Sequence, residues 1–269
     1  MPTRDEPWPD GTPCWVGAQV DDVGAARAFY AGLLGWEIHD GPPEAGGYLM
    51  AVRDGRPVAG LGPMPEGEPM PPAWTTYFAA GDADDVAGDA ADAGGTVFVP
   101  PFDVFDLGRM AVVGDPAGAV FGVWQAGSHH GTGVFNEPGA PCWHELHTRD
   151  YASVQEFYAV VFGWTYREIG DGENLIYSVF ANVEGTVVGG VCDDAVIGVP
   201  AQVPAHWLTW FAVADADDAA EATVRLGGTV GGEPRDSPFG RMVVAQGPCG
   251  EMFGLIDPAS GREDVPPRG

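Results

Sequence analysis

The chain has 269 residues, of which 45% are hydrophobic and 11% aromatic, enough to bury the cores of two ordinary domains. Its 39 acidic residues outnumber 12 basic ones and give a formal net charge of -27. Such a charge repels phosphate backbones and anionic lipid headgroups, so we expect no nucleic-acid partner and no membrane partner. Every basic residue is arginine, which excludes a lysine nucleophile or Schiff base.

The N-terminus and the cysteines indicate a cytoplasmic protein. The first residues lack a basic start followed by an apolar run, and no apolar stretch of about 18 residues occurs, so we predict neither an export signal nor a membrane span. The cysteines Cys14, Cys142, Cys192 and Cys249 form no C-x-x-C pair. We therefore expect free, mostly buried thiols.

The first half of the chain predicts two helices among short strands. Asp22 precedes a run of apolar residues at helical spacing, and Gly35 follows it, so we predict a helix over 22–34. A second helix is predicted over 82–93 by the same signals. Strands bounded by Gly, Pro or Asp are predicted over 14–20, 48–52, 57–61, 74–79, 109–113 and 119–125.

The second half of the chain repeats the first. The matching motifs are Pro13-Cys14-Trp15 with Pro141-Cys142-Trp143, Phe29-Tyr30 with Phe157-Tyr158, and Gly108-Arg109-Met110 with Gly240-Arg241-Met242. The equivalent helices follow Asp150 and Asp215. A period this long indicates duplicated domains rather than a solenoid. We predict a first domain over 1–127, a polar, glycine-rich linker over 128–140, and a second domain with a short tail over 141–269.

The order of elements resembles the vicinal oxygen chelate superfamily of glyoxalases, bleomycin resistance proteins and extradiol dioxygenases. The motifs that carry the resemblance are a helix ending in Phe-Tyr before Gly-Trp and the turn Asp115-Pro116-Ala117-Gly118. Trp143-x-Glu145-Leu146-x-Thr148 is similar to the tandem glyoxalase-like proteins of actinobacteria. The resemblance implies an α+β fold of two tandem glyoxalase-like domains, each a pair of βαβββ modules that form a curved, partly closed sheet.

The resemblance also implies where a metal would be bound. Metal-dependent members place a His or Gln on the first strand, a His on the fifth and a Glu on the last, as an open divalent-metal centre. Those positions here are Trp15, Thr75 and Gly122 in the first copy and Trp143, Leu208 and Gly254 in the second. None is a sound ligand, so we predict no cofactor and no metal at this site. A register shifted by one residue would place only His144 in a ligand position.

Polar residues converge in one copy only. Strand alternation places Glu145 and His147 on one face, and His206 shares the face of the nearby Leu208. We predict that the glutamate and the two histidines are catalytic as an acid–base group, or hold a divalent metal at a non-standard site. A buried polar network is the structural alternative. The first copy has Gly17, Gln19 and Ala73 at the equivalent positions. Any chemistry is therefore expected in the second copy.

Aromatic residues on predicted strands favour a flat, apolar ligand. The expected ligand contacts are Trp15 and Gln19 in the first copy and Trp143 and Trp207 in the second. Arg109 and Arg241 are expected to clamp a ligand carboxylate or phenolate, with an ion pair to a helix aspartate as the alternative. His129 and His130, in the linker, are interpreted as part of a solvated loop.

Three functions remain open from the sequence. The first is metal-independent binding, or weak tailoring or resistance activity, directed at a small hydrophobic and aromatic metabolite. The second is a metal-dependent lyase, isomerase or dioxygenase with a non-standard site in the second domain. The third is a protein that acts only through protein partners. The chain is expected to be either a monomer with its domains paired internally or a homodimer.

Overall fold

The helices begin where the sequence predicts them. The computed structural model describes residues 2–65 and 70–261. Its helices are α1 (Val23–Leu34), α2 (Ala83–Asp92), α3 (Tyr151–Phe162) and α4 (Ala216–Arg225). A side-chain oxygen of Asp22 accepts the backbone N–H of Ala25 at 2.9 Å, and Gly35 ends α1 in the left-handed region at φ 70°. No helix in this described part is long and apolar enough to span a membrane.

Strands form the rest of each copy. The first copy contains β1 (Pro13–Val20), β2 (Glu37–Asp40), β3 (Leu49–Arg53), β4 (Arg56–Pro63), β5 (Ala73–Ala79), β6 (Thr96–Val104), β7 (Gly108–Gly114) and β8 (Val120–Ala126). The second contains β9 (Pro141–Thr148), β10 (Thr165–Glu168), β11 (Tyr177–Ala181), β12 (Val187–Asp193), β13 (His206–Ala212), β14 (Thr229–Val230), β15 (Arg235–Ser237), β16 (Gly240–Gln246) and β17 (Met252–Asp257). Short 3-10 segments occupy Pro43–Ala45 and Pro258–Ser260.

The strands predicted from the sequence do not include β2 and β6. The positions of these two strands in the sheet explain why. Both lie at the ends of the first sheet, where little of either strand is buried. Their residues therefore lack the alternation of hydrophobic and polar side chains on which a strand prediction depends. Two prolines, Pro100 and Pro101, also stand inside β6, as is tolerated on an edge strand.

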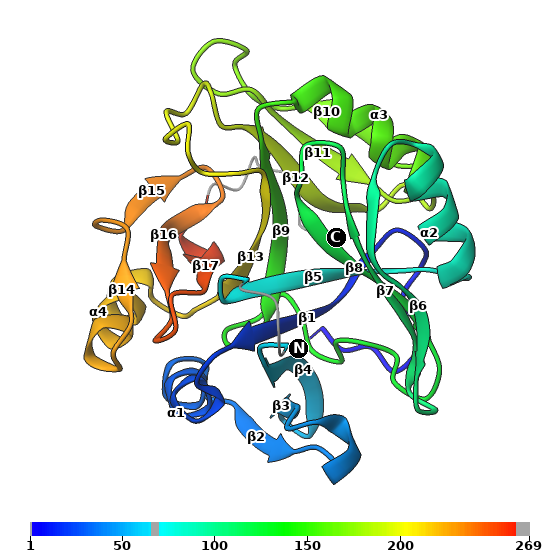
Figure 1. Cartoon of the computed structure of the whole chain (residues 1–269). Coiled ribbons are helices and arrows are strands. Elements are labelled where there is room, and N and C mark those ends of the chain that lie inside the picture. Colours follow the sequence, from blue (N-terminus) through cyan, green and yellow to red (C-terminus); the bar gives the residue numbers. More distant parts are fainter. Residues whose placement is uncertain (1, 66–69, 262–269) are drawn as a thin grey trace.

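Each copy builds one curved sheet from two βαβββ modules (Figure 1). The first strands of the two modules lie antiparallel at the centre, as β1 with β5 and as β9 with β13. The strand orders are β2-β3-β4-β1-β5-β8-β7-β6 and β10-β11-β12-β9-β13-β17-β16-β14, with β15 beside β16. Neither order closes on itself in the described residues. The predicted α+β fold of two partly closed sheets is confirmed.

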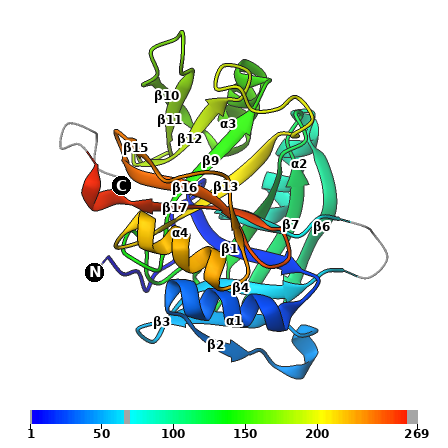
Figure 2. The same ribbon diagram turned by 90° about the vertical axis from the view of Figure 1, so that its left-hand side faces the viewer.

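The two main cores each combine both copies. Helix α1 packs with α4, and α2 with α3, as Figure 2 shows for the first pair. In one core the ring of Phe29 on α1 lies 6.2 Å from that of Phe253 on β17. In the other, Phe121 on β8 lies 6.3 Å from Phe157 on α3. Each copy therefore buries its helices and one sheet face against the other copy.

A tyrosine in each core joins the two copies by hydrogen bonds. The hydroxyl of Tyr30 donates to Oε1 of Glu251 at 2.8 Å and accepts the indole N–H of Trp74 at 2.9 Å. Glu251 is fully buried, and desolvation raises the pKa of its carboxyl group. The equivalent contacts in the other core join Tyr158, Asp115 and Trp207.

The copies are related by a local twofold axis. The equivalent residues Thr76 on β5 and Thr209 on β13 meet with their hydroxyl oxygens 3.2 Å apart. Further from this contact, one tryptophan of each copy donates its indole N–H to the backbone segment just before the first strand of the other copy. These bonds run from Trp36 to the Gly139 carbonyl at 2.6 Å and from Trp164 to the Gly11 carbonyl at 2.8 Å. The internal pairing is therefore isologous.

Replacing Tyr30 with phenylalanine should destabilise the fold by about 1–3 kcal/mol, because it leaves a buried carboxyl oxygen and a buried indole N–H without their partner. Urea unfolding measures the change. Tyr151→Phe is the matched control, since that hydroxyl donates to Glu168 at an exposed position, and it should cost less than about 0.5 kcal/mol. Equal losses in the two variants would contradict the assigned role of Tyr30.

Candidate functional site

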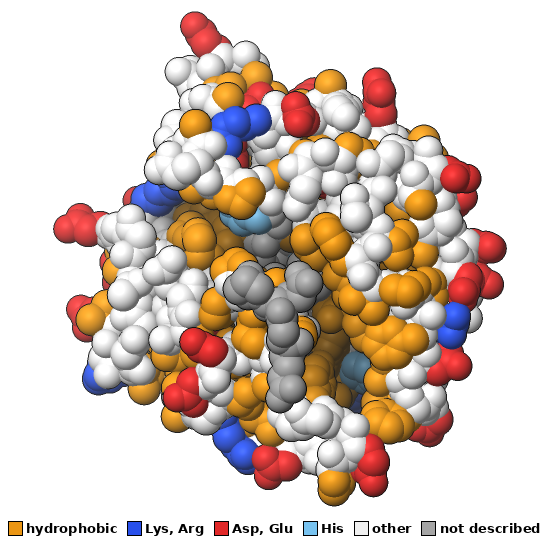
Figure 3. Space-filling model, viewed as in Figure 1, with side chains coloured by type: hydrophobic (Ala, Val, Ile, Leu, Met, Phe, Trp, Pro, Cys, Tyr) orange, Lys and Arg blue, Asp and Glu red, His pale blue; other side chains and the backbone are white. Residues whose placement is uncertain are grey.

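The face of each sheet opposite its helices forms a cavity. We call it the cavity face. Along β1, Val16 and Ala18 enter the core with α1, whereas Trp15 packs with Trp124 on the cavity face. On β9, Leu146 enters the core and Trp143 lies on the cavity face. Figure 3 shows hydrophobic side chains gathered where this side of the molecule is hollowed, with histidine side chains among them.

A hydrogen-bonded Trp–Tyr pair occurs on both cavity faces. Trp15 donates its indole N–H to the hydroxyl of Tyr48 at 3.0 Å, and Trp143 donates to Tyr177 at 2.9 Å. Each tyrosine ring lies over a glycine of the neighbouring strand, where a Cβ would overlap the hydroxyl group. These glycines are Gly60 and Gly190. Neither tyrosine is among the ligand contacts predicted from the sequence, although the two stand at equivalent places of the repeat, before these glycines.

The positions at which metal-dependent members of the family carry their metal ligands lie on the cavity faces. The strand register used to locate them in the sequence requires this. In the first copy Gly17 pairs with Thr75, and Trp15 with Tyr77, which in turn pairs with Gly122. In the second copy the corresponding residues Trp143, Leu208 and Gly254 also lie on the cavity face. In the second copy a tryptophan, an aliphatic side chain and a glycine offer no metal ligand, and in the first copy only the hydroxyl of Thr75 is polar. These positions therefore do not fit the family's metal.

The alternative register for His144 is wrong. This ring lies on the core face of β9, where Nδ1 is 3.2 Å from the Thr76 hydroxyl. Burial lowers the pKa of His144 to about 3, so the ring is neutral at physiological pH. Within residues 2–65 and 70–261, no cluster of three or more His, Cys, Asp or Glu side chains has an arrangement suited to a metal ion.

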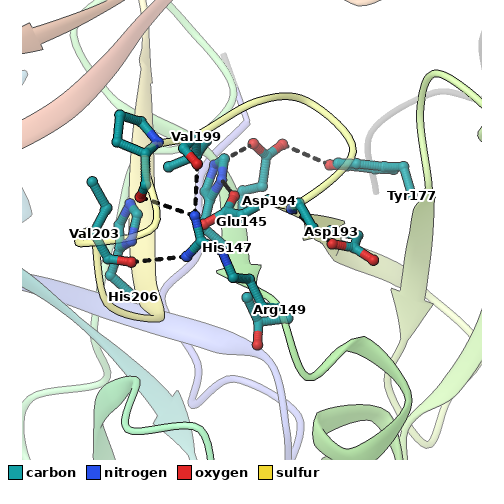
Figure 4. Close-up of polar contacts among 12 residues, drawn as sticks. Glu145, His147, Arg149, Tyr177, Asp193, Asp194, Val199, Val203 and His206 are labelled. Atoms are coloured by element: carbon teal, nitrogen blue, oxygen red, sulfur yellow. Dashed lines mark hydrogen bonds and ion pairs between the residues drawn. The ribbon is translucent and has the colours of Figure 1, made fainter.

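The structure brings together the polar residues predicted in the second copy (Figure 4). Nε2 of His147 lies 2.8 Å from Oε1 of Glu145, although it is not aligned as a hydrogen-bond donor to that oxygen. Nδ1 of His147 lies 2.7 Å from Oδ1 of the fully buried Asp194. The other glutamate oxygen accepts the hydroxyl of Tyr177 at 2.8 Å. A continuous polar chain thus runs from the Trp–Tyr pair to Asp194.

The charges of His147 and Glu145 follow from the contacts of these side chains. Burial alone would lower the pKa of His147, but hydrogen bonding to Asp194 and the contact with Glu145 raise it to about 9. Burial alone would raise the pKa of the Glu145 carboxyl, but the contacts with His147 and Tyr177 and the charge of Arg235 together lower it. At neutral pH the site therefore holds an imidazolium between two carboxylates.

His206 completes the group from the neighbouring strand. It pairs with His147 across β9 and β13, and the two rings stack with centroids 5.0 Å apart and planes 9° from parallel. Nδ1 of His206 lies 2.9 Å from the carbonyl oxygen of Pro204. Burial and the nearby His147 lower the pKa of His206. Glu145, His147 and His206 thus share one site, and their roles in it stay predictions.

A loop that the sequence did not identify supplies Asp194. The guanidinium of Arg149, at the end of β9, donates to the carbonyl groups of Val199, Pro200 and Val203 at 2.7–3.0 Å (Figure 4). This clamp fixes the loop after β12 beside His147. Met64 stands at the equivalent place after β4 of the first copy, and Asp194 lies beyond the end of β12, so neither repeat nor strand alternation could have indicated Asp194.

The first cavity face is more apolar. Gly17, Gln19 and Ala73 stand where the second copy has its acid and two histidines, so Gln19 lies on the cavity face as expected. The interpretation of His129 as solvated is wrong, because its ring packs edge-on against Trp15 at 4.5 Å. Burial lowers the pKa of His129 to about 4, which leaves a neutral ring.

Three expected ligand contacts lie elsewhere. Trp207 is on the core face of β13, because it alternates with His206 and Leu208, and it cannot line the cavity. Arg109 and Arg241 lie on the helix side of their sheets. Their partners there are Asp84 and Asp103 for the first arginine and Asp217 and Asp236 for the second, at 2.5–3.0 Å. The expectation of an arginine clamp is wrong, and the ion-pair alternative describes both.

Comparison with known proteins gives the class. A model of the Glyoxalase/Bleomycin resistance protein/Dioxygenase superfamily matches residues 14–123 and 143–255. The chain belongs to this superfamily, as two tandem domains. It is 41% identical over 266 residues to CFP32 of Mycobacterium tuberculosis, whose name assigns it provisionally to the glyoxylases; the match covers 96% of this chain and 99% of that one.

Other relatives come from secondary metabolism. The chain is 36% identical over 263 residues to the anthracycline biosynthesis protein DnrV of Streptomyces peucetius, covering 92% of this chain and 93% of the relative. Among solved structures, the Mn(II)-bound glyoxalase of Novosphingobium aromaticivorans gives a TM-score of 0.62 at 17% identity, over 94% of this chain and 86% of that one. The 2,3-dioxygenase LapB of Pseudomonas sp. KL28 gives 0.60 at 15%, over 96% of each chain. These structures share the fold.

Stability should depend on pH through His147. Its folded pKa of about 9 exceeds the unfolded value of 6.5, so its stabilising contribution is complete below pH 6.5 and is lost as pH rises through 9. We expect the free energy of unfolding to fall by roughly 2–3 kcal/mol over this interval relative to His147→Gln. Urea titrations at a series of pH values measure it. Parallel profiles for the two proteins would contradict an imidazolium at this position.

Proposed function

We propose that the protein binds a small, hydrophobic, aromatic metabolite on its cavity faces, without a metal at the family's ligand positions. The observation that carries this proposal is the Trp–Tyr pair of each copy, which places large rings where metal-dependent members hold their ion. Indole and phenol rings offer broad, flat contact surfaces and favour ligands of similar shape. The binding is either the whole function or the first step of a tailoring or resistance activity.

The relatives support an aromatic ligand. Two Streptomyces relatives carry names from anthracycline biosynthesis, and anthracyclines are planar polycyclic compounds. The surrounding side chains agree with such a shape. On the first cavity face they include Trp15, Tyr77, Met110 and Trp124, and on the second Trp143, Tyr177, Leu208 and Trp210. A screen should therefore begin with naphthalene- and anthracene-based compounds.

The polar chain of the second copy favours a second candidate, acid–base chemistry on the bound metabolite. His147 is held between two carboxylates, an arrangement that fixes both its orientation and its charge. A lyase or isomerase needs such a fixed acid close to a base, and His206 lies beside it. A dioxygenase would need a divalent ion at this non-standard position.

Binding should survive removal of metal ions. We expect a saturable aromatic ligand, detected by tryptophan fluorescence and calorimetry, to bind equally well before and after treatment with a chelator. Trp143→Leu should weaken its binding to the second copy by about tenfold or more, because the ring contact and the support of Tyr177 are both lost. Arg241→Met is the control, since this side chain pairs with Asp217 on the helix side.

Two results would overturn this proposal. One is the absence of any saturable ligand for either copy across the aromatic series. The other is a stoichiometric divalent metal in the purified protein whose removal abolishes binding and whose retention requires His147. The second result would instead establish the metal-dependent alternative.

A further inference from the structure

The tautomer of His206 is fixed by its backbone contact. Nδ1 lies 2.9 Å from the carbonyl oxygen of Pro204, and a carbonyl oxygen only accepts hydrogen bonds. Nδ1 therefore carries the proton, and Nε2 of the neutral ring carries the lone pair. The ring is half-buried on the cavity face of β13. In the part of the chain that the structure describes, no hydrogen bond occupies Nε2.

The charges around His206 keep its ring neutral at physiological pH. The groups that act on it are the positively charged His147 stacked against it, the Asp194 and Glu145 carboxylates, and the Pro204 carbonyl. Burial has the largest effect on its pKa and lowers it, and His147 lowers it further; the three oxygen groups oppose this shift. Nε2 is consequently a hydrogen-bond acceptor with a fixed direction.

The lone pair on Nε2 also selects the ligand. An anionic oxygen has no proton to donate to Nε2 and is repelled by its lone pair, whereas an uncharged hydroxyl group donates. The first copy lacks this acceptor, because Gln19 and Ala73 stand at the equivalent pair of positions.

We propose that the second cavity selects aromatic ligands that carry an uncharged hydroxyl group, a phenol or an enol, and that Nε2 of His206 accepts the hydrogen bond from this group. This inference rests on the proposed function, because it assumes that an aromatic ligand occupies the cavity. It makes His206 a specificity-determining residue and His147 a positioning residue. An acceptor that the bound ligand covers rejects an analogue that cannot donate, since the acceptor would lose its water without gaining a partner.

Three probes of nearly equal shape test the proposal: 1-naphthol, 1-methoxynaphthalene and 1-naphthoic acid. Calorimetry on the full chain at pH 7.5 should show 1-naphthol binding about tenfold or more tightly than the other two. His206→Phe should bring the affinities of the naphthol and its methyl ether together, because the acceptor is lost while the aromatic surface stays. His206→Gln, whose amide oxygen also accepts, should restore part of the preference.

The pH dependence gives an independent measurement. As pH falls below the lowered pKa of His206, protonation turns Nε2 into a donor, so the preference for 1-naphthol over its methyl ether should decrease in the native protein. It should not change in His206→Phe. Arg241→Met, whose side chain pairs with Asp217 on the helix side, is the control and should leave the preference unchanged.

The possible failures are distinct. Equal binding of 1-naphthol and its methyl ether to the native protein would overturn the role of His206 and leave the proposed function standing. A preference that persists in His206→Phe would do the same. Failure of all three probes to bind would overturn the proposed function and this inference together.

Discussion

The structure depends on the reciprocal burial of two tyrosines. Each lies on a helix of one copy and bonds to a buried carboxyl group of the other, as Tyr30 does with Glu251 and Tyr158 with Asp115. Backbone N–H groups of the same copy bond to one oxygen of each desolvated carboxyl group, and the tyrosine of the opposite copy donates to the other oxygen. The hydrophobic cores impose the same condition, since each combines helices and strands of both copies. Neither copy can therefore bury its helix face alone.

This constraint explains how the two copies have diverged. The core faces retain the same residue types at equivalent places, such as Phe78 and Phe211, because both cores need them. The cavity faces share the Trp–Tyr pair, the glycines under its tyrosines, and Met110 with Met242. At other places they differ: a glycine in one copy corresponds to Glu145 in the other, with no change in strand register. Divergence was possible on the cavity face because the packing of the copies does not involve it.

The difference between regular elements and irregular segments explains which features could be predicted from the sequence. The helices and the central strands follow from aspartate caps, glycine stops and alternation, and alternation also placed Glu145, His147 and His206 on one face. Contacts from irregular segments could not be predicted: Asp194 comes from the loop after β12, and His129 folds back from the linker onto Trp15. These positions depend on loop paths, which leave no periodic signal.

The polar chain formed by Glu145, His147 and Asp194 in the second copy is not explained by a contribution to the stability of the fold. Removing two carboxylates and an imidazolium from water carries a desolvation cost that their mutual attraction often fails to exceed. The side chains of Glu145 and His147 are only 14% and 11% exposed, and that of Asp194 is fully buried. The first copy forms the same sheet with Gly17 and Gln19 at the positions of the glutamate and the first histidine. Since the fold does not require these charges, their presence in the second copy supports the proposal that a ligand contacts them.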